Sequence, residues 1–260
     1  DVVESADTRF HEGQQVLVTG CGLGEEVDGG YSEFARVDGD WLIPVPEGMD
    51  ARGVMTLGTA GFTAALAITR MERNGQNPEH GPIVVTGATG GVGSFAIDML
   101  AGRGYEVVAV SGKKEAARWL KKIGATKVLD RHKIAHGDRP LEAALWGGAI
   151  DNVGGDTLAW LTRTVNWWGN IASIGLVGGH ELNTTVMPFI LRGISLLGVN
   201  SVKTPRNERK EIWKRIAGDL RPRHLDAIRT REIDFDELPD AFADYLEGKV
   251  MGRTVVRIGA

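Results

Sequence analysis

The sequence predicts an α/β fold built on a doubly wound parallel sheet, and three observations predict it. Apolar runs with the period of strands alternate with segments that have the period of helices along the middle of the chain. A glycine-rich turn at residues 87–93 follows one of these strands and opens a helix. The chain has 260 residues, of which 42% are hydrophobic and 25% charged, an ordinary globular composition. Strand, helix and strand repeated in this way indicate a parallel sheet.

The predicted elements follow the change of period along the chain. Helices are expected from about Ser94 to Arg103, from Lys114 to Ile123 and from Asp156 to Asn166. Strands are expected at Val16–Thr19, Ile83–Thr86, Glu106–Val110, Lys127–Leu129, Ala149–Val153, Asn170–Ile174, Ser195–Val199 and Thr254–Ile258. Residues 65–200 are therefore predicted to form a nucleotide-binding domain of the Rossmann type. This domain is expected to be inserted between two pieces of a second domain, residues 1–64 and 201–260.

Composition excludes several classes of function. The net charge of −4 and the pI of about 5.9 give no general attraction to nucleic acid or to an anionic membrane. Neither a signal segment nor a run of roughly 18 apolar residues is visible, so a cytoplasmic protein without a membrane span is expected. Cys21 is the single cysteine, which excludes an internal disulfide and a cysteine-rich zinc lobe. His132 and His136 lack the glutamate and third ligand of a zinc helix, so no metal site is predicted.

The glycine-rich turn suggests a phosphate site. Gly87, Gly90, Gly91 and Gly93 have no side chains, so the backbone can turn sharply and a pyrophosphate can approach the N–H groups of the next helix. The positive end of the helix dipole favours the same anion. A glycine cluster also fits a tight turn without a ligand. We interpret the turn as the phosphate cradle of a dinucleotide-binding protein.

The end of the second strand of this domain predicts which dinucleotide binds. An acidic residue there would bond the ribose hydroxyls of NAD, whereas small hydroxyl and basic residues accommodate a 2′-phosphate. The sequence has Ser111-Gly112-Lys113-Lys114 at this position, and Arg131 follows the third strand. Lys113 and Lys114 also fit a solvated helix start, but cations are unfavourable beside the positive end of a helix dipole. The pattern favours NADPH over NADH.

A second dehydrogenase pattern is also present but stands in the wrong context. Residues 86–93 satisfy the Thr-Gly-x-x-x-Gly-x-Gly pattern of short-chain dehydrogenases, and Tyr245 and Lys249 supply a Tyr-x-x-x-Lys. Those enzymes place the glycines at their first strand near the N-terminus and continue well beyond the tyrosine. Here a long segment precedes the glycines and little follows Lys249. Tyr245 is therefore expected to end a helix and to have no catalytic role.

Four motifs, in order along the chain, resemble the zinc-independent quinone reductases of the medium-chain dehydrogenase/reductase superfamily. They are Gly58–Ala64, Val85–Gly93, Asp151–Gly155 and Thr184–Arg192. A narrower resemblance, to the acrylyl-CoA reductase branch of that superfamily, is carried by Gly39–Leu42, Met187–Arg192 and Gly252–Val256. The resemblance covers essentially the whole chain.

The resemblance implies that the second domain is a GroES-like, β-rich domain. In this family a further segment precedes the position of Asp1, so the chain is expected to begin inside that domain. The preceding segment would carry a tyrosine that lines the nicotinamide pocket. Cys21 stands in a Thr-Gly-x-Gly stretch where relatives usually have tryptophan, which would change the local shape of the pocket. The implied architecture is a Rossmann domain inserted in a GroES-like domain whose N-terminal part is absent.

The resemblance also implies roles for individual residues toward the cofactor. Gly90, Gly91, Val92 and Gly93 would contact the pyrophosphate. Ser111, Gly112, Lys113 and Arg131 would surround the adenosine 2′-phosphate. The nicotinamide riboside would be contacted by Thr63, Leu176, Ile190 and Ser201. Arg253 would reach back to the cofactor from the last strand. Leu176 and Ile190 also fit a simple core, and Arg253 a surface charge.

The implied reaction is the NADPH-dependent reduction of an activated alkene, with acrylyl-CoA giving propanoyl-CoA. Negative charge then develops on the thioester oxygen, so catalysis needs alignment and a donor near that oxygen. Asn200 is the candidate donor, although it also fits a turn. The basic residues of segment 203–223 would either attract the phosphates of CoA or form a solvated helix face.

Three functions stay open at this point. The first is the reduction of an enoyl thioester by NADPH, and the second is the reduction of a quinone by NADPH through the same hydride chemistry. The third is the binding or sensing of NADPH without turnover. By analogy with the fold, a homodimer is expected to form through the edge strand Ser195–Val199.

Overall fold

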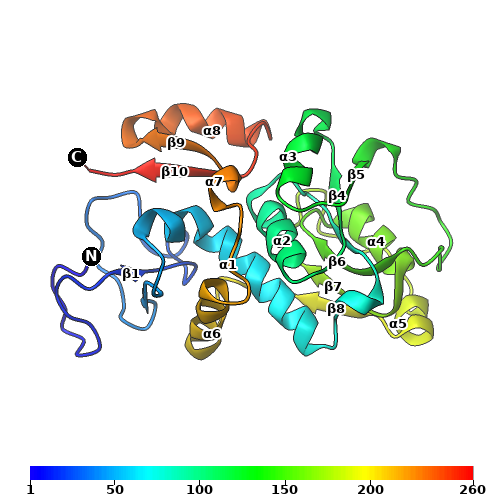
Figure 1. Ribbon diagram of the computed structural model, residues 1–260, viewed down its shortest axis with the longest axis horizontal. Coiled ribbons are helices and arrows are strands. Elements are labelled where there is room, and N and C mark those ends of the chain that lie inside the picture. Colours follow the sequence, from blue (N-terminus) through cyan, green and yellow to red (C-terminus); the bar gives the residue numbers. More distant parts are fainter. Residues whose placement is uncertain (260) are drawn as a thin grey trace.

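A six-stranded parallel sheet occupies one half of the molecule, on the right in Figure 1. The structure is a computed structural model and describes residues 1–259. The strands lie in the order β5 (Lys127–Asp130), β4 (Val107–Ser111), β3 (Ile83–Val85), β6 (Trp146–Asp151), β7 (Val165–Ser173) and β8 (Ser195–Gly198). The strand order reverses between β3 and β6, and at such a point the carboxyl ends of the strands leave a crevice for a ligand. The predicted doubly wound parallel sheet is confirmed.

Alternation along the strands sends side chains to two helical layers. Ile83 and Val85 of β3 belong to one apolar core, together with α1 (Ala51–Arg73) and α2 (Gly91–Gly102). Val84 points the opposite way, into a second core with α4 (Gly155–Thr164). The remaining helices of this region are α3 (Ala117–Lys122) and α5 (Met187–Arg192). Because both faces of the sheet are covered, all residues of β3, β4 and β6 are buried, which explains why their sequences lack polar side chains until Ser111 ends β4 and Asp151 ends β6.

Helix α1 was not predicted from the sequence, and it is the longest helix of the described chain. Asp50 begins it by accepting a hydrogen bond from the backbone N–H of Gly53 (2.7 Å). By length and composition α1 could cross a membrane, but 72% of its most apolar window is buried inside the protein, which is typical of a core helix. The predicted domain boundary at residue 64 falls inside α1. The division into domains stays a prediction.

The two flanking segments contain little regular structure before α1 and a mixed unit after β8. Residues 1–50 form the short antiparallel pair β1 (Val16–Leu17) and β2 (Ile43–Pro44). The C-terminal segment folds into α6 (Arg206–Ala217), α7 (Leu225–Ile228), β9 (Arg229–Asp234), α8 (Leu238–Leu246) and β10 (Arg253–Arg257). Short 3-10 turns lie at Pro78–His80, Lys114–Ala116, Arg131–Lys133 and Phe235–Glu237. In Figure 1 both chain ends lie at the end of the molecule away from β5, the C-terminus next to β10 and the N-terminus next to β1.

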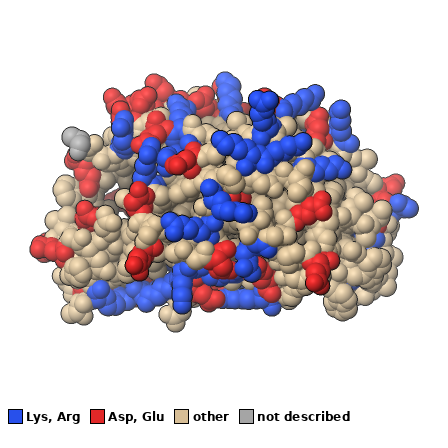
Figure 2. Space-filling view, viewed as in Figure 1, with Lys and Arg blue, Asp and Glu red and all other residues tan. Residues whose placement is uncertain are grey.

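Charges on the face shown in Figure 2 are of both signs, with basic side chains gathered over α3. Exposed residues there are Lys114, Arg118, Lys121 and Lys122. The basic segment 203–223 does not form one solvated face, because Arg209 is 1% exposed and Arg215 is paired with Glu72 (2.7 Å). Arg209 therefore neither attracts the phosphates of CoA nor belongs to a solvated helix face, and both alternatives predicted for the segment are wrong for this residue.

Candidate nucleotide-binding and catalytic site

The glycine turn joins β3 to α2 at the point where the strand order reverses. Gly87 adopts a left-handed conformation (φ +56°), which favours glycine because a side chain there is strained. At Gly93 a Cβ would lie 2.8 Å from the Cα of Ala88, so only glycine allows the helix to pack on the turn. Gly90 begins α2 without a side-chain cap, and the first turn contains no acidic residue. The first N–H groups of α2 therefore lack a side-chain partner and can receive a pyrophosphate.

Arg253 brings a cation from β10 to this helix start. Its Nε donates to the carbonyl oxygen of Thr56 (3.0 Å). Helix α1 leaves helical geometry at Gly58 (φ +49°), and a Cβ there would lie 2.9 Å from Arg253 Nη2. On the other side, a Cβ on Gly91 would lie 3.0 Å from Arg253 Cδ. The kink at Gly58 and the missing side chain at Gly91 together make room for the guanidinium.

The environment of Arg253 indicates an anion. Burial lowers the pKa of its guanidinium, which still remains charged at neutral pH. Within residues 1–259 no carboxylate forms an ion pair with it. A partly buried cation without a carboxylate, beside a helix N-terminus that has no side-chain cap, fits a phosphate ligand. The alternative that Arg253 is a simple surface charge does not agree with this burial.

A network of hydrogen bonds fixes the crevice between β3 and β6. The hydroxyl of Thr86 donates to the Asp151 carboxylate (2.6 Å), which also accepts from the N–H of Gly154 (2.8 Å). Burial raises the pKa of Asp151, and these hydrogen bonds act in the opposite direction. Asn152 donates its side-chain amide to the carbonyl oxygen of Thr86 (2.8 Å). The network therefore holds the two strand ends on either side of the crevice together.

Asn152 was not predicted as a site residue. Its Oδ1 atom is buried and has no hydrogen-bond partner within residues 1–259. A Cβ on Gly87 would lie 3.1 Å from Asn152 Cβ, so the orphan acceptor borders the glycine turn. Buried polar atoms normally have partners, so this oxygen is suited to a hydroxyl donor of a bound nucleotide. Its signal in the sequence is its position directly after a buried strand, at the strand's carboxyl end.

The residues predicted for the adenosine 2′-phosphate lie together at the ends of β4 and β5. Ser111 ends β4 and accepts a hydrogen bond from the N–H of Lys113 (3.0 Å). A Cβ on Gly112 would lie 2.5 Å from Arg131 Nε, so the guanidinium covers this glycine. Burial lowers the pKa of Lys113; the charge of Glu115 acts in the opposite direction, and the charge of Arg131 lowers the pKa further. Neither Lys113 nor Arg131 forms an ion pair with a carboxylate within residues 1–259, so the two cations together fit a phosphate dianion. Lys113 also donates from Nζ to the carbonyl oxygen of Val250 (2.7 Å).

Two of the residues predicted for the nicotinamide, Leu176 and Ser201, lie past the carboxyl edge of the sheet. Leu176 follows β7, and Ser201 follows β8. Thr63 belongs to α1, which packs against β7, and its hydroxyl donates to the carbonyl oxygen of Thr59 (2.6 Å). Leu176 is 66% exposed, which excludes the alternative that it is a core residue. A Cβ on Gly154 would lie 3.1 Å from the Cα of Leu176, so Leu176 borders the crevice between β3 and β6.

Ile190 lies elsewhere. It belongs to α5, where Arg192 donates to the carbonyl oxygens of Arg163 (2.8 Å) and Val165 (3.1 Å). Val165 begins β7, so α5 lies at the amino-terminal edge of the sheet, opposite the edge that carries Ser201. Ile190 is 72% exposed and is therefore not a core residue either. The structure does not bring it together with the other predicted nicotinamide residues of the same chain.

Asn200 is held in a turn just after β8. Its Oδ1 accepts hydrogen bonds from the N–H groups of Val202 (3.1 Å) and Lys203 (2.9 Å). Two donors on one oxygen leave the Nδ2 atom as the free donor of the amide, and Nδ2 has no partner within residues 1–259. Asn200 is exposed. The turn role and the donor role are therefore compatible, because different atoms of one side chain serve them.

Relatives match almost the whole chain. The zinc-binding dehydrogenase family matches residues 91–218. AcuI of Ruegeria pomeroyi, an acrylyl-CoA reductase by name, is 46% identical over 260 residues, which are 100% of this chain and 78% of that protein. YhfP of Bacillus subtilis, whose name describes a quinone oxidoreductase, is 47% identical over 258 residues, 99% of this chain and 78% of the relative.

Solved structures also resemble almost the whole chain. A crystal structure of YhdH from E. coli K-12 with bound NADPH superposes with a TM-score of 0.93 at 47% identity, covering 98% of this chain and 78% of that one. The structure of Bacillus subtilis YhfP with bound NAD superposes with a TM-score of 0.96 at 47% identity, covering 99% and 78%. The chain therefore belongs to the medium-chain dehydrogenase/reductase superfamily of oxidoreductases, in the branch that contains AcuI and YhfP.

Proposed function

We propose that the protein uses NADPH to reduce an activated alkene, with acrylyl-CoA giving propanoyl-CoA. The proposal rests on two cationic sites that one bound dinucleotide would contact. Arg253 stands at the uncapped start of α2, and Lys113 and Arg131 converge at the end of β4. A dinucleotide with an additional phosphate satisfies both sites. The identity with AcuI supports the thioester as substrate.

The residues of the chain would bind, orient and stabilise charge. When bound, NADPH supplies a hydride from the nicotinamide to the β-carbon of the alkene and leaves as NADP⁺. The electron pair of the alkene moves toward the thioester oxygen, where negative charge develops, and the α-carbon takes a proton. Asn200 Nδ2 would donate to that oxygen, and because Asn200 is exposed, water can deliver the proton. Thr63, Leu176 and Ser201 would frame the nicotinamide.

The substrate is tested by stopped-flow measurement of NADPH oxidation. Rapid oxidation with acrylyl-CoA and slow oxidation with a simple quinone is the expected result. The opposite preference would establish the second candidate, a quinone reductase, which the name of YhfP favours. Tight NADPH binding without oxidation by either compound would contradict both reductase functions and would favour a protein that binds NADPH without turnover.

Arg131→Ala should weaken NADPH binding and leave NADH binding nearly unchanged. Arg131 covers Gly112 at the predicted 2′-phosphate position and has no carboxylate partner within residues 1–259. One charge-assisted contact to a phosphate contributes on the order of 1.5–3 kcal/mol, so the Kd for NADPH should rise about tenfold or more. Fluorescence titration with both nucleotides checks this. An equal loss for both would show that Arg131 does not contact the 2′-phosphate.

Turnover should not require a metal, although the matched family is described as zinc-binding. In residues 1–259 no group of three or more His, Cys, Asp or Glu side chains is placed to hold an ion. Prolonged dialysis against a strong chelator should leave the rate of NADPH oxidation unchanged, and metal analysis should find no stoichiometric zinc. Loss of activity on chelation, with recovery on adding zinc, would contradict the proposal.

A homodimer through the β8 edge is proposed as the assembly. Strand β8 ends the sheet, and its neighbourhood exposes the apolar side chains of Trp168, Ile190 and Leu191. A second copy would cover both the strand edge and this surface. Sedimentation velocity should give the mass of a dimer for the wild type and of a monomer for Ile190→Glu. A wild type that sediments as a monomer would refute the assembly.

A further inference from the structure

Residues Val250–Arg253 connect the two cationic sites that are proposed to hold the nucleotide. We call this segment the C-terminal strap. At one end Lys113 Nζ donates to the carbonyl oxygen of Val250 (2.7 Å). In the middle the N–H of Gly252 donates to the carbonyl oxygen of Thr89 (2.9 Å), which belongs to the glycine turn. At the other end Arg253 lies against Gly91. The strap therefore connects the adenosine end of the site to the pyrophosphate end.

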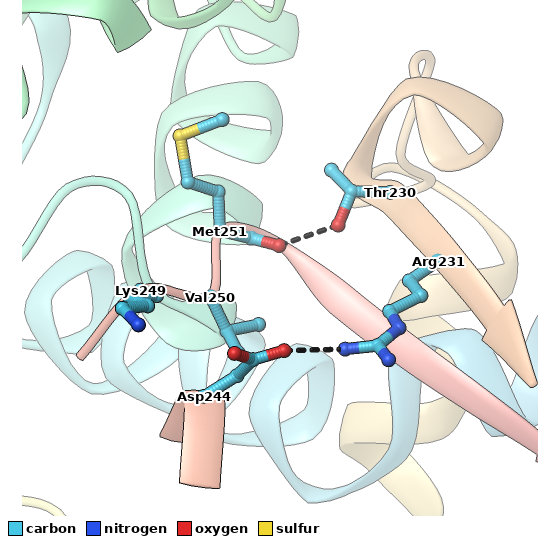
Figure 3. Close-up of a pocket in the computed structure, with 6 residues that line it drawn as sticks. All are labelled: Thr230, Arg231, Asp244, Lys249, Val250 and Met251. Carbon is cyan, nitrogen blue, oxygen red and sulfur yellow. Dashed lines mark hydrogen bonds and ion pairs between the residues drawn. The ribbon is translucent and has the colours of Figure 1, made fainter. Parts of the chain in front are cut away.

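The strap is also fixed to the C-terminal unit from which it comes. Thr230 of β9 donates to the carbonyl oxygen of Met251 (2.5 Å), as Figure 3 shows. Gly252 has φ +59° and passes so close to the carbonyl oxygen of Ile228 that a Cβ would collide with it. The pocket of Figure 3 lies beside the strap and is lined in part by an ion pair of Arg231 with Asp244 (2.9 Å). These contacts join the strap, and with it the backbone of Arg253, to β9 and α7.

Lys113 is the contact of the strap that a phosphate can influence. An ammonium group has three donors. Val250 takes one of them, which leaves two for a phosphate between Lys113 and Arg131. Arg131 has no contact with the strap among the hydrogen bonds of residues 1–259. Lys113 and Arg131 thus offer the same charge to the same ligand, but only Lys113 joins the ligand to the strap.

We propose that Lys113 is a positioning residue that couples the 2′-phosphate of NADPH to the placement of Arg253 on the pyrophosphate, through the C-terminal strap. The proposal rests on the proposed use of NADPH. A phosphate held by Lys113 fixes the ammonium against Val250, and the strap then holds the guanidinium at the start of α2. NADPH would in this way hold Arg253 more firmly at the pyrophosphate than NADH does, because NADH lacks the 2′-phosphate.

Nucleotide titrations of Lys113→Met, with Arg131→Ala as the matched control, test the coupling. Both variants remove one charge from the same site, so both should lose affinity for NADPH. Lys113→Met should in addition raise the Kd for NADH about fivefold, because the strap loses its anchor, whereas Arg131→Ala should not. Lys113→Arg, which keeps a donor for Val250, should restore NADH affinity. Equal NADH affinity in Lys113→Met and Arg131→Ala would overturn the proposal.

Two further measurements do not depend on turnover. Hydrogen exchange of the peptide that contains Gly252 should be slowed more by NADPH than by NADH in the wild type, and equally by both in Lys113→Met. In a double-mutant cycle, Arg253→Gln should cost less NADH affinity in the Lys113→Met background than in the wild type. Additive effects would exclude a coupling through the strap. A wild type that binds neither nucleotide would refute the proposed function itself, which distinguishes the two failures.

Discussion

Gly91→Val should abolish the binding of both NADPH and NADH while the protein still folds. A Cβ at this position would lie 3.0 Å from both Ala60 Cβ and Arg253 Cδ, so the guanidinium must shift. The two methyl groups of valine would extend from that Cβ into the space in front of the first turn of α2, where the pyrophosphate is proposed to bind. Because the loss affects a part common to both nucleotides, it should exceed a hundredfold for each, roughly 2.8 kcal/mol.

A matched control separates this effect from general damage to glycine sites. A Cβ on Gly30 would meet nothing within 4 Å, so Gly30→Val should bind both nucleotides as the wild type does. Titration calorimetry gives the affinities, and circular dichroism shows that each variant is folded. If Gly91→Val kept its affinity within about threefold of the wild type, the glycine turn would be only a structural turn.

The central sheet could be predicted from the sequence because its strands are fully buried. The apolar runs of β3 and β4 contain no polar residue before their ends, and each gives way to glycine or to a helical period. Burial on both faces imposes this pattern, so the pattern reveals the position in the sheet. The glycine turn was found for a related reason, since close packing at Gly93 tolerates no side chain.

Other elements could not be predicted because distant contacts decide them. Helix α1 contains Gly58 and Gly61 and several threonines, which weaken a helical signal, and it is stabilised by burial against α2 and α6. Strand β9 has the charged sequence Arg-Thr-Arg-Glu-Ile-Asp and forms because β10 pairs with it. The clustering of Arg253 with Gly91 depends on residues far apart in the chain, and only the resemblance to a family suggested it.

The burial of Arg209 is another feature that could not be predicted from the sequence, because distant residues surround it. The sequence placed it in a basic stretch, yet its guanidinium lies over the ring of Phe62, with Cζ 5.0 Å from the ring centroid. It donates to the carbonyl oxygens of Thr19, Val202 (3.2 Å) and Thr204 (3.4 Å). Burial lowers its pKa, and no carboxylate compensates its charge within residues 1–259. Backbone carbonyls from two loops provide the compensation instead.

Arg209→Met should therefore destabilise the fold and loosen the loop that carries Asn200. Methionine fills part of the volume but leaves several buried carbonyl oxygens without donors, each costing about 1–3 kcal/mol before relaxation and water entry. We expect the free energy of unfolding to fall by about 3–5 kcal/mol, as when one partner of a buried charged network is removed. Urea unfolding measures this, with Lys210→Met, an exposed neighbour on α6, as the control. A loss below about 1 kcal/mol would show that water replaces the guanidinium, and that Arg209 does not hold the two loops together.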